Sequence, residues 1–259
     1  MSGFAGVMAV VLTELLAGAA AFTWLTPLWN EARRTHFRVF GLVVTPLVGV
    51  PAWLAATQGL EPESVAGSWA VRLVALATGC AAASTLGLLA RREALGRAFG
   101  IATIPAATAA LVAFAGTGRG APITDAAQLL AGAAFLGAVF DGLFLGHWYL
   151  TDRKLTRRPI RRITQIAIAA SAVGIAGIAL GGFEATPATE AFVNPLLTAG
   201  ALAPWIALGS AFTTLVVCVL ALAALRGERP SAVQAATGFY YLGVITALTA
   251  EVAARVRFL

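Results

Sequence analysis

The sequence predicts an all-α, polytopic membrane protein, built as a helix bundle with eight transmembrane helices. Two features of its composition lead to this prediction. Hydrophobic residues make up 59% of the 259 residues and charged residues only 12%, whereas a soluble domain has about 25% charged residues. The mean hydropathy is +0.84. This composition excludes a soluble globular enzyme, a disordered chain and a disulfide-stapled secreted module.

Eight apolar stretches are long enough to cross a bilayer, which takes about 20 mostly apolar residues in a helix. In chain order they cover approximately residues 4–28, 39–58, 69–90, 98–116, 126–150, 162–182, 201–225 and 233–255. The first stretch is long and lacks a basic segment before it, so we expect a retained helix rather than a cleaved signal peptide. The connections are short, which predicts a single integral membrane domain over 1–259.

The cations gather in alternate connections. Fourteen of the eighteen Lys and Arg residues lie in the first, third, fifth and seventh connections: Arg33, Arg34, Arg38, Arg91, Arg92, Arg97, Arg153, Lys154, Arg157, Arg158, Arg161, Arg162, Arg226 and Arg229. Cation-rich connections stay cytoplasmic, so we expect both termini outside, in a bacterial-type inner (plasma) membrane. The net charge of +6 would suggest nucleic acid in a soluble protein. Here it predicts contact with anionic lipid or an acidic subunit, and no nucleic acid.

The two halves of the chain, 1–124 and 125–259, resemble each other. Four pairs of residues recur at an offset of 124: Trp24 and Trp148, Arg33 and Arg157, Arg34 and Arg158, Arg38 and Arg162. Each pair follows the first helix of its half. This spacing favours a repeat of two four-helix units in parallel orientation, although aromatic belts and basic connections recur in membrane proteins without duplication.

Three acidic residues fall within the predicted spans: Glu14, Asp141 and Glu251. An ionisable group inside a bilayer is costly and therefore indicates function by default. Under the offset of 124, Glu14 maps one helical turn from Asp141 on a similar face, so we expect both carboxylates at the bundle interior as proton carriers. Glu251 precedes Arg255 by four residues, the spacing of a helical ion pair. A purely structural role for these acids is the alternative.

The fifth stretch ends with an imidazole, an indole and a phenol in succession, at His147, Trp148 and Tyr149. A quinone ring requires apolar walls, a hydrogen-bond donor for each carbonyl oxygen and a proton source. We therefore predict a quinone site in which His147 and Tyr149 donate and Asp141 relays protons, with Glu14 in support. The alternative for the two aromatic residues is an interfacial belt.

Haem b is a competing cofactor, since bis-histidine ligation needs two imidazoles that face each other. The chain contains only His36 and His147, and His36 falls in the first basic connection, where a solvated side chain is more typical. The cysteines, Cys80 and Cys218, lie in apolar stretches and form no metal-binding motif. The sequence therefore favours quinone and predicts no metal site.

Two short segments, Thr13–Gly18 and Ala250–Phe258, together with the layout of the whole chain, resemble the membrane subunits of polysulfide reductase and dimethyl sulfoxide reductase complexes. The second segment holds Glu251, Arg255 and Phe258, similar to the acid, arginine and aromatic residue in that family's last helix. The resemblance implies two four-helix bundles, oxidation or reduction of menaquinone or ubiquinone, and an iron–sulfur partner. The chain has no counterpart of the family's histidine in the second helix.

The function that the sequence predicts is a quinone-binding membrane subunit of a respiratory oxidoreductase complex, in a hetero-oligomer with an iron–sulfur or haem subunit. We expect the site of Asp141, His147 and Tyr149 at the inner face and the Glu251–Arg255 pair at the outer face, so that they form separate sites. The alternatives are a proton- or ion-coupled transporter that uses Glu14 and Asp141, and a purely structural anchor.

Overall fold

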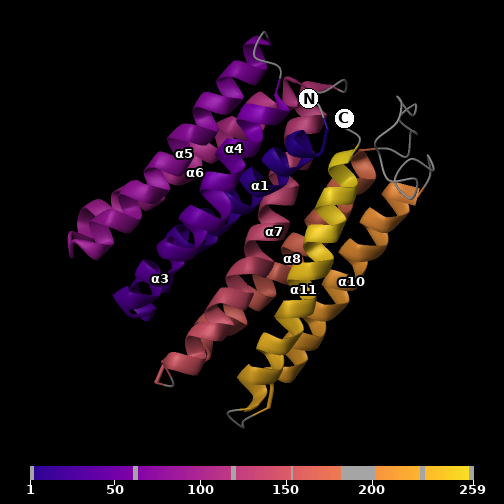
Figure 1. Cartoon of the computed structure of the whole chain (residues 1–259). Helices are drawn as coiled ribbons and strands as arrows, with labels where there is room; N and C mark the ends of the chain where they lie inside the picture. The colour runs from indigo at the N-terminus through magenta and orange to yellow at the C-terminus, as the bar shows by residue number, and fades with distance from the viewer. Residues whose placement is uncertain are drawn as a thin grey trace.

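Every regular element is helical in the residues that the computed structural model describes, which are 3–60, 64–117, 121–152, 154–181, 202–227 and 231–256. The helices are α1 (Gly3–Leu25), α2 (Leu28–Glu31), α3 (Arg34–Val44), the π-helical segment η1 (Thr45–Gly49), α4 (Val50–Gly59), α5 (Val65–Leu89), α6 (Glu93–Ala115), α7 (Pro122–Thr151), α8 (Arg158–Leu180), α10 (Leu202–Ala224) and α11 (Ser231–Arg255). Figure 1 shows the long helices side by side in one bundle.

Seven helices in these ranges are long and apolar enough to cross a membrane: Gly3–Leu25, Arg34–Gly59, Val65–Leu89, Glu93–Ala115, Pro122–Thr151, Arg158–Leu180 and Leu202–Ala224. The predicted multi-pass helix bundle is therefore confirmed. Helix α11 has 25 residues and lies alongside the others (Figure 1), but it is not apolar enough to be counted with the seven. The second span begins at Arg34, five residues before the predicted start, and η1 joins α3 to α4 without a break.

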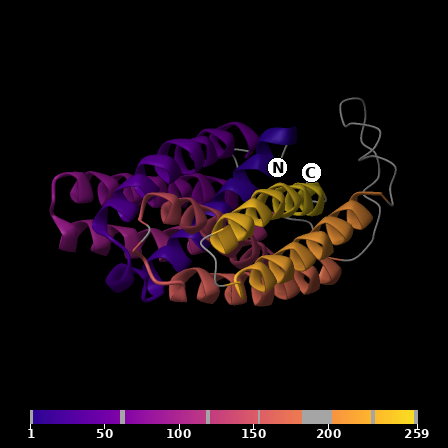
Figure 2. The same cartoon turned by 90° about the horizontal axis from the view of Figure 1, so that it is seen from below.

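The helices form two groups of four with the same order of neighbours. In the first group α1 packs on α4, the α3–α4 helix packs on α5, α5 on α6, and α6 back on α1. In the second group α7 packs on α8, α8 on α10, α10 on α11, and α11 back on α7. Figure 2, the view from below, shows α10 and α11 (orange and yellow) to one side of the indigo-to-magenta group. The boundary lies between α6, which ends at Ala115, and α7, which begins at Pro122. The predicted division into 1–124 and 125–259 falls in the first turn of α7, and duplication itself stays a prediction.

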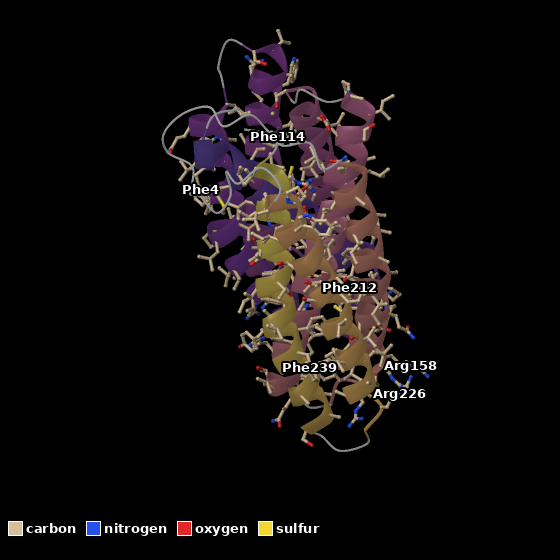
Figure 3. The ribbon with its side chains drawn as sticks, turned by 90° about the vertical axis from the view of Figure 1, so that its right-hand side faces the viewer. Phe4, Phe114, Arg158, Phe212, Arg226 and Phe239 are labelled. Atoms are coloured by element: carbon tan, nitrogen blue, oxygen red, sulfur yellow. The ribbon has the colours of Figure 1, made fainter. Side chains whose placement is uncertain are left out.

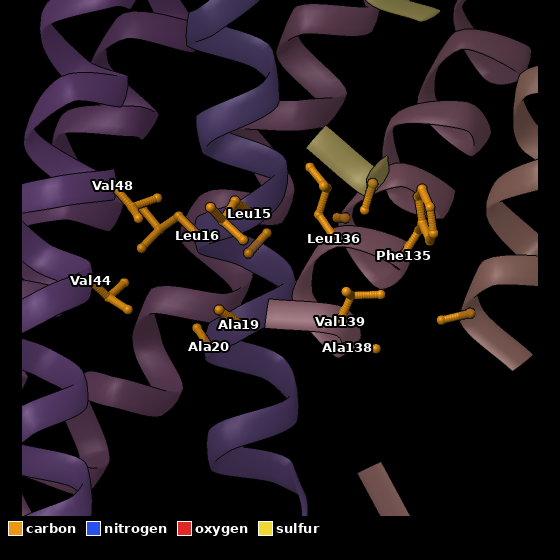
Figure 4. Packing of buried hydrophobic residues seen from close by; sticks show 14 of the residues in the cluster. Leu15, Leu16, Ala19, Ala20, Val44, Val48, Phe135, Leu136, Ala138 and Val139 are labelled. Atoms are coloured by element: carbon orange, nitrogen blue, oxygen red, sulfur yellow. The ribbon is translucent and has the colours of Figure 1, made fainter. Parts of the chain in front are cut away.

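The two groups meet along α1 and α7, whose backbones touch. A Cβ atom on Gly18 would lie 1.8 Å from the carbonyl oxygen of Ala133, and one on Gly137 would lie 2.2 Å from the carbonyl carbon of Gly18. Small residues allow such close approach of helices in a membrane. We call this contact the α1–α7 seam. Buried side chains flank it: in Figure 4, Leu16 extends toward Val48 and Leu136 lies on the α7 side.

The cation-rich connections lie at one end of the bundle. Figure 1 shows the ends of α5, α7 and α10 there, opposite the end at which α1 begins and α11 ends. In Figure 3, Arg158 and Arg226 lie at this end, and Phe4 and Phe114 lie toward the other. Three residues named above lie outside the described residues: Arg153, Arg229 and Phe258.

The seam predicts that a methyl group on Gly18 destabilises the protein strongly. Gly18→Ala forces α1 and α7 apart, and overpacking of this kind costs about 1–3 kcal/mol or more. Gly79 is the matched control, since a Cβ there meets nothing within 4 Å. Thermal unfolding in detergent should show a clearly lower midpoint for Gly18→Ala than for Gly79→Ala. Equal midpoints would show that the seam is not closely packed.

Candidate functional site

Asp141 lies in a small cavity between the two groups of helices. It is 5% exposed, and its Oδ2 accepts a hydrogen bond from Thr23 Oγ1 of α1 at 3.0 Å. Its Oδ1 is buried and has no hydrogen-bond partner among the described residues. The cavity has a volume of about 10 Å³ and is lined by Phe22, Thr26, Leu28, His36, Asp141, Phe144, Leu145, Pro159, Arg162, Ile163 and Ile166. We call it the Asp141 cavity.

His36 shares this cavity, and the expectation of a solvated loop histidine is wrong. Helix α3 begins at Arg34, so His36 lies in its first turn and is 1% exposed. Its ring makes edge contacts with Phe144 and Trp148, each with 5.3 Å between ring centroids. Its Nδ1 has no hydrogen-bond partner in the described part of the chain. The sequence held a signal for this position, because His36, Phe40 and Val44 are four residues apart and thus share a helical face.

The two donors predicted beside Asp141 are engaged elsewhere. His147 Nδ1 lies 3.0 Å from the carbonyl oxygen of Leu143. A carbonyl only accepts, so Nδ1 carries the hydrogen and Nε2 accepts a hydrogen bond from the Tyr241 hydroxyl of α11. The Tyr149 hydroxyl donates to the carbonyl oxygen of Thr156, in the connection between α7 and α8. Neither His147 nor Tyr149 lines the Asp141 cavity.

Trp148 is the member of the predicted aromatic run that approaches the cavity. Its indole packs on His36, and its Nε1 is buried without a hydrogen-bond partner among the residues described. The two histidines therefore lie in different surroundings. His36 is buried beside the cavity, whereas both ring nitrogens of His147 are hydrogen bonded to the protein. This geometry does not favour a haem held between them.

A salt bridge joins the two groups at the rim of the Asp141 cavity. The guanidinium of Arg162, on α8, donates to both carboxylate oxygens of Glu31 on α2, with Nη1 at 3.2 Å from Oε1. Such two-point contacts fix the relative orientation of the partners. A second pair, Arg33 Nε and Asp152 Oδ2 at 3.1 Å, links the halves at the same end. The cavity is therefore enclosed by residues from both halves.

Glu14 lies in a second buried cluster and not beside Asp141. Its Oε1 accepts from Arg255 Nε at 2.8 Å and lies 2.7 Å from Arg255 Nη2. The same Nη2 lies 2.6 Å from Oε2 of Glu251, which gives the predicted ion pair at i,i+4. We call these three residues the Arg255 cluster. All three lie inside the bundle, at 0% exposure for both glutamates and 1% for Arg255.

The grouping of Glu14 with Asp141 is thus corrected, and the reason is their depth. Glu14 precedes Thr23, the partner of Asp141, by nine residues, which is about 13 Å along a helix. The repeat offset relates equivalent positions of the two halves, and one of these positions lies on α1 and the other on α7. Similar register in the sequence therefore does not bring the two carboxylates together.

A glycine of α7 provides the space for the Arg255 cluster. A Cβ on Gly132 would lie 2.4 Å from Arg255 Nη2, 2.7 Å from Glu14 Oε1 and 2.9 Å from Glu251 Oε2. Arg255 also donates from Nη2 to the carbonyl oxygen of Gln128 on α7, at 3.1 Å. The cluster therefore joins three helices, α1, α7 and α11. It lies on one side of the Gly18–Gly137 contact, and the Asp141 cavity lies on the other.

No family model, curated protein or solved structure matches the chain. The geometry of the two buried sites therefore provides the basis for a functional proposal.

Arg255→Met should destabilise the protein severely. The substitution leaves two buried glutamates without their cation, and breaking a buried ion pair from one side costs about 3–5 kcal/mol. The control is Arg92→Met, because Arg92 is exposed and surface substitutions usually change stability by less than about 0.5 kcal/mol. Thermal unfolding in detergent compares the two variants. Similar midpoints would contradict a structural role for the Arg255 cluster.

Proposed function

We propose that this chain is the membrane subunit of a respiratory redox complex, and that it binds quinone at the Asp141 cavity. The observation that carries the proposal is the meeting of Asp141 and His36, from different halves, around one cavity. Each presents a buried polar atom that no described residue satisfies, Oδ1 of Asp141 and Nδ1 of His36. Buried polar atoms are nearly always hydrogen bonded, so this pair is suited to a polar ligand.

The lining of the cavity supports a ligand that is mainly apolar with few polar atoms. Phe22, Phe144 and Ile166 provide apolar walls, and the polar lining residues are Thr26, His36, Asp141 and Arg162. This combination is typical of small-molecule sites. The enclosed volume of about 10 Å³ is roughly room for one water molecule. Entry of a ring therefore requires movement of side chains at the rim, where Phe22 and Ile166 are only half-buried.

Quinone, when bound, exchanges two electrons and two protons. The role of Asp141 follows from its contacts: Thr23 occupies Oδ2, so a proton is held or released at Oδ1. His36 offers Nδ1 as a hydrogen-bonding group for a carbonyl oxygen. The indole of Trp148, packed on the imidazole, restricts the orientation of His36. Arg162 and Glu31 restrict access of water from the end of the bundle.

The orientation and the partner form part of the same proposal. Helix α11 serves as an eighth span, since it is as long as the others and lies against α7 and α10. The cation-rich end is cytoplasmic by the positive-inside rule, which leaves both termini outside in a bacterial-type inner membrane. The Asp141 cavity then faces the cytoplasmic side. Electrons reach it from a partner with an iron–sulfur cluster or haem, in a hetero-oligomer. The two halves of this chain arose by duplication.

Asp141→Asn should abolish quinone turnover in the native complex while the complex still assembles. General acid–base groups contribute about 10²–10⁴-fold to rate, so we expect a loss of at least about 100-fold. The experiment isolates the tagged chain from native membranes in mild detergent, identifies its subunits and extractable quinone by mass spectrometry, and measures quinone reduction or quinol oxidation. Glu93→Gln, in the exposed ion pair with Arg34, is the control and should retain activity.

Two results would contradict the proposal. One is a chain that purifies alone, without a redox subunit or quinone. The other is an Asp141→Asn complex with the turnover of the control.

A proton- or ion-coupled transporter is the second candidate, and the π-helical segment η1 favours it. Pro46 lies within η1 and Pro51 follows it at the start of α4. Such interruptions are frequent at functional sites and in transporters. The corresponding helix of the second half, α8, is an uninterrupted α-helix. Transporters of this kind carry matching interruptions in both halves, so we prefer the redox subunit.

A further inference from the structure

Nη2 of Arg255 lies close to more acceptor oxygens than its hydrogens can satisfy. Arg255 Nη2 carries two hydrogens, yet it lies within 3.1 Å of three oxygens: Oε1 of Glu14, Oε2 of Glu251 and the carbonyl oxygen of Gln128. Glu14 also receives the Nε hydrogen. Glu251 has an ion-pair contact but no hydrogen bond of good geometry at either oxygen, within the ranges that the structure describes.

The charges in this cluster do not balance. Two carboxylates from α1 and α11 face one guanidinium, and Asp125 of α7 adds a further acidic group near Arg255. Among the described residues, Arg255 is the cation that contacts Glu14 and Glu251. A second ionised carboxylate would leave an uncompensated charge inside the bundle, which costs several kcal/mol or more. Binding of a proton removes that charge.

We infer that the Arg255 cluster is a binding site for one proton, and that Glu251 carries it. Glu14 is the ionised partner because it accepts from Nε and contacts Nη2 of Arg255. Glu251 is the neutral partner because neither of its oxygens accepts a hydrogen bond of good geometry and its carboxyl group is fully buried. Its ion-pair contact is with Nη2, which Glu14 also contacts. This site lies apart from the Asp141 cavity, and the inference is independent of quinone binding.

Substitution by glutamine distinguishes the two glutamates. A neutral amide replaces a protonated carboxyl group with little change in charge or shape. Glu251→Gln should therefore fold with the thermal midpoint of the parent at neutral pH, whereas Glu14→Gln should lower the midpoint because it removes the negative charge bound to Arg255. A Glu251→Gln chain that fails to fold, or that is less stable than Glu14→Gln, would overturn the inference.

Infrared spectroscopy of the full chain in nanodiscs tests the proton directly. All variants are made in an Asp141→Asn background, so that Asp141 adds no signal. We expect a carbonyl-stretch band of a protonated carboxylic acid at neutral pH, lost on Glu251→Gln and retained on Glu93→Gln, an exposed ion-pair residue. The absence of the band, or its loss on Glu14→Gln with retention on Glu251→Gln, would overturn the inference.

A metal cation is the competing occupant, and a salt series separates it from the proton. With a bound proton, the thermal midpoint is the same in sodium, potassium and choline chloride at equal concentration. A sodium-dependent rise that Glu251→Gln abolishes would assign the site to a cation and overturn the inference.

Discussion

The direct backbone contact of α1 with α7 determines where Glu14 and Asp141 lie relative to the residues that contact them. At this seam Gly18 and Gly137 leave no room for a side chain, so the two helices are held in one register. Gly132 lies beside Glu14, and Asp141 lies beside Thr23. Both pairs are separated by 118 residues in the chain, which means that α1 and α7 run parallel with a constant offset. A shift of one turn would separate Asp141 from Thr23 and close the space for Arg255.

The Asp141 cavity exists only where the two halves meet. Thr23 and His36 come from the first half, and Asp141 and Arg162 come from the second. The four helices of either half have the same order of neighbours, yet they differ at the seam. Trp24 packs on Trp29 and Phe37, whereas its repeat partner Trp148 packs on His36. Equivalent aromatic residues thus have different neighbours in the two halves.

The sequence predicted the helical class and the apolar spans because both depend on composition and on length. It identified Glu14, Asp141, Glu251 and Arg255 as notable because charges are rare in apolar stretches. It did not reveal which of them meet. The pairing of Glu14 with Arg255 joins the first and last helices, and no short-range sequence pattern predicts it because the two residues are 241 positions apart. The burial of His36 was missed because the basic segment around it resembles a loop. Its spacing from Phe40 and Val44 is the signal that places it on a buried helical face.

The Gly18–Gly137 contact also fixes how far apart the two buried sites lie along the bundle. Glu14 and Thr23, the partner of Asp141, are nine residues apart on α1, which is about 13 Å along a helix. Moving one elementary charge through a potential of 100 mV changes its energy by about 2.3 kcal/mol. A proton at the Arg255 cluster and one at Asp141 therefore experience different potentials. The register of α1 and α7 therefore fixes the difference in membrane potential between the two sites.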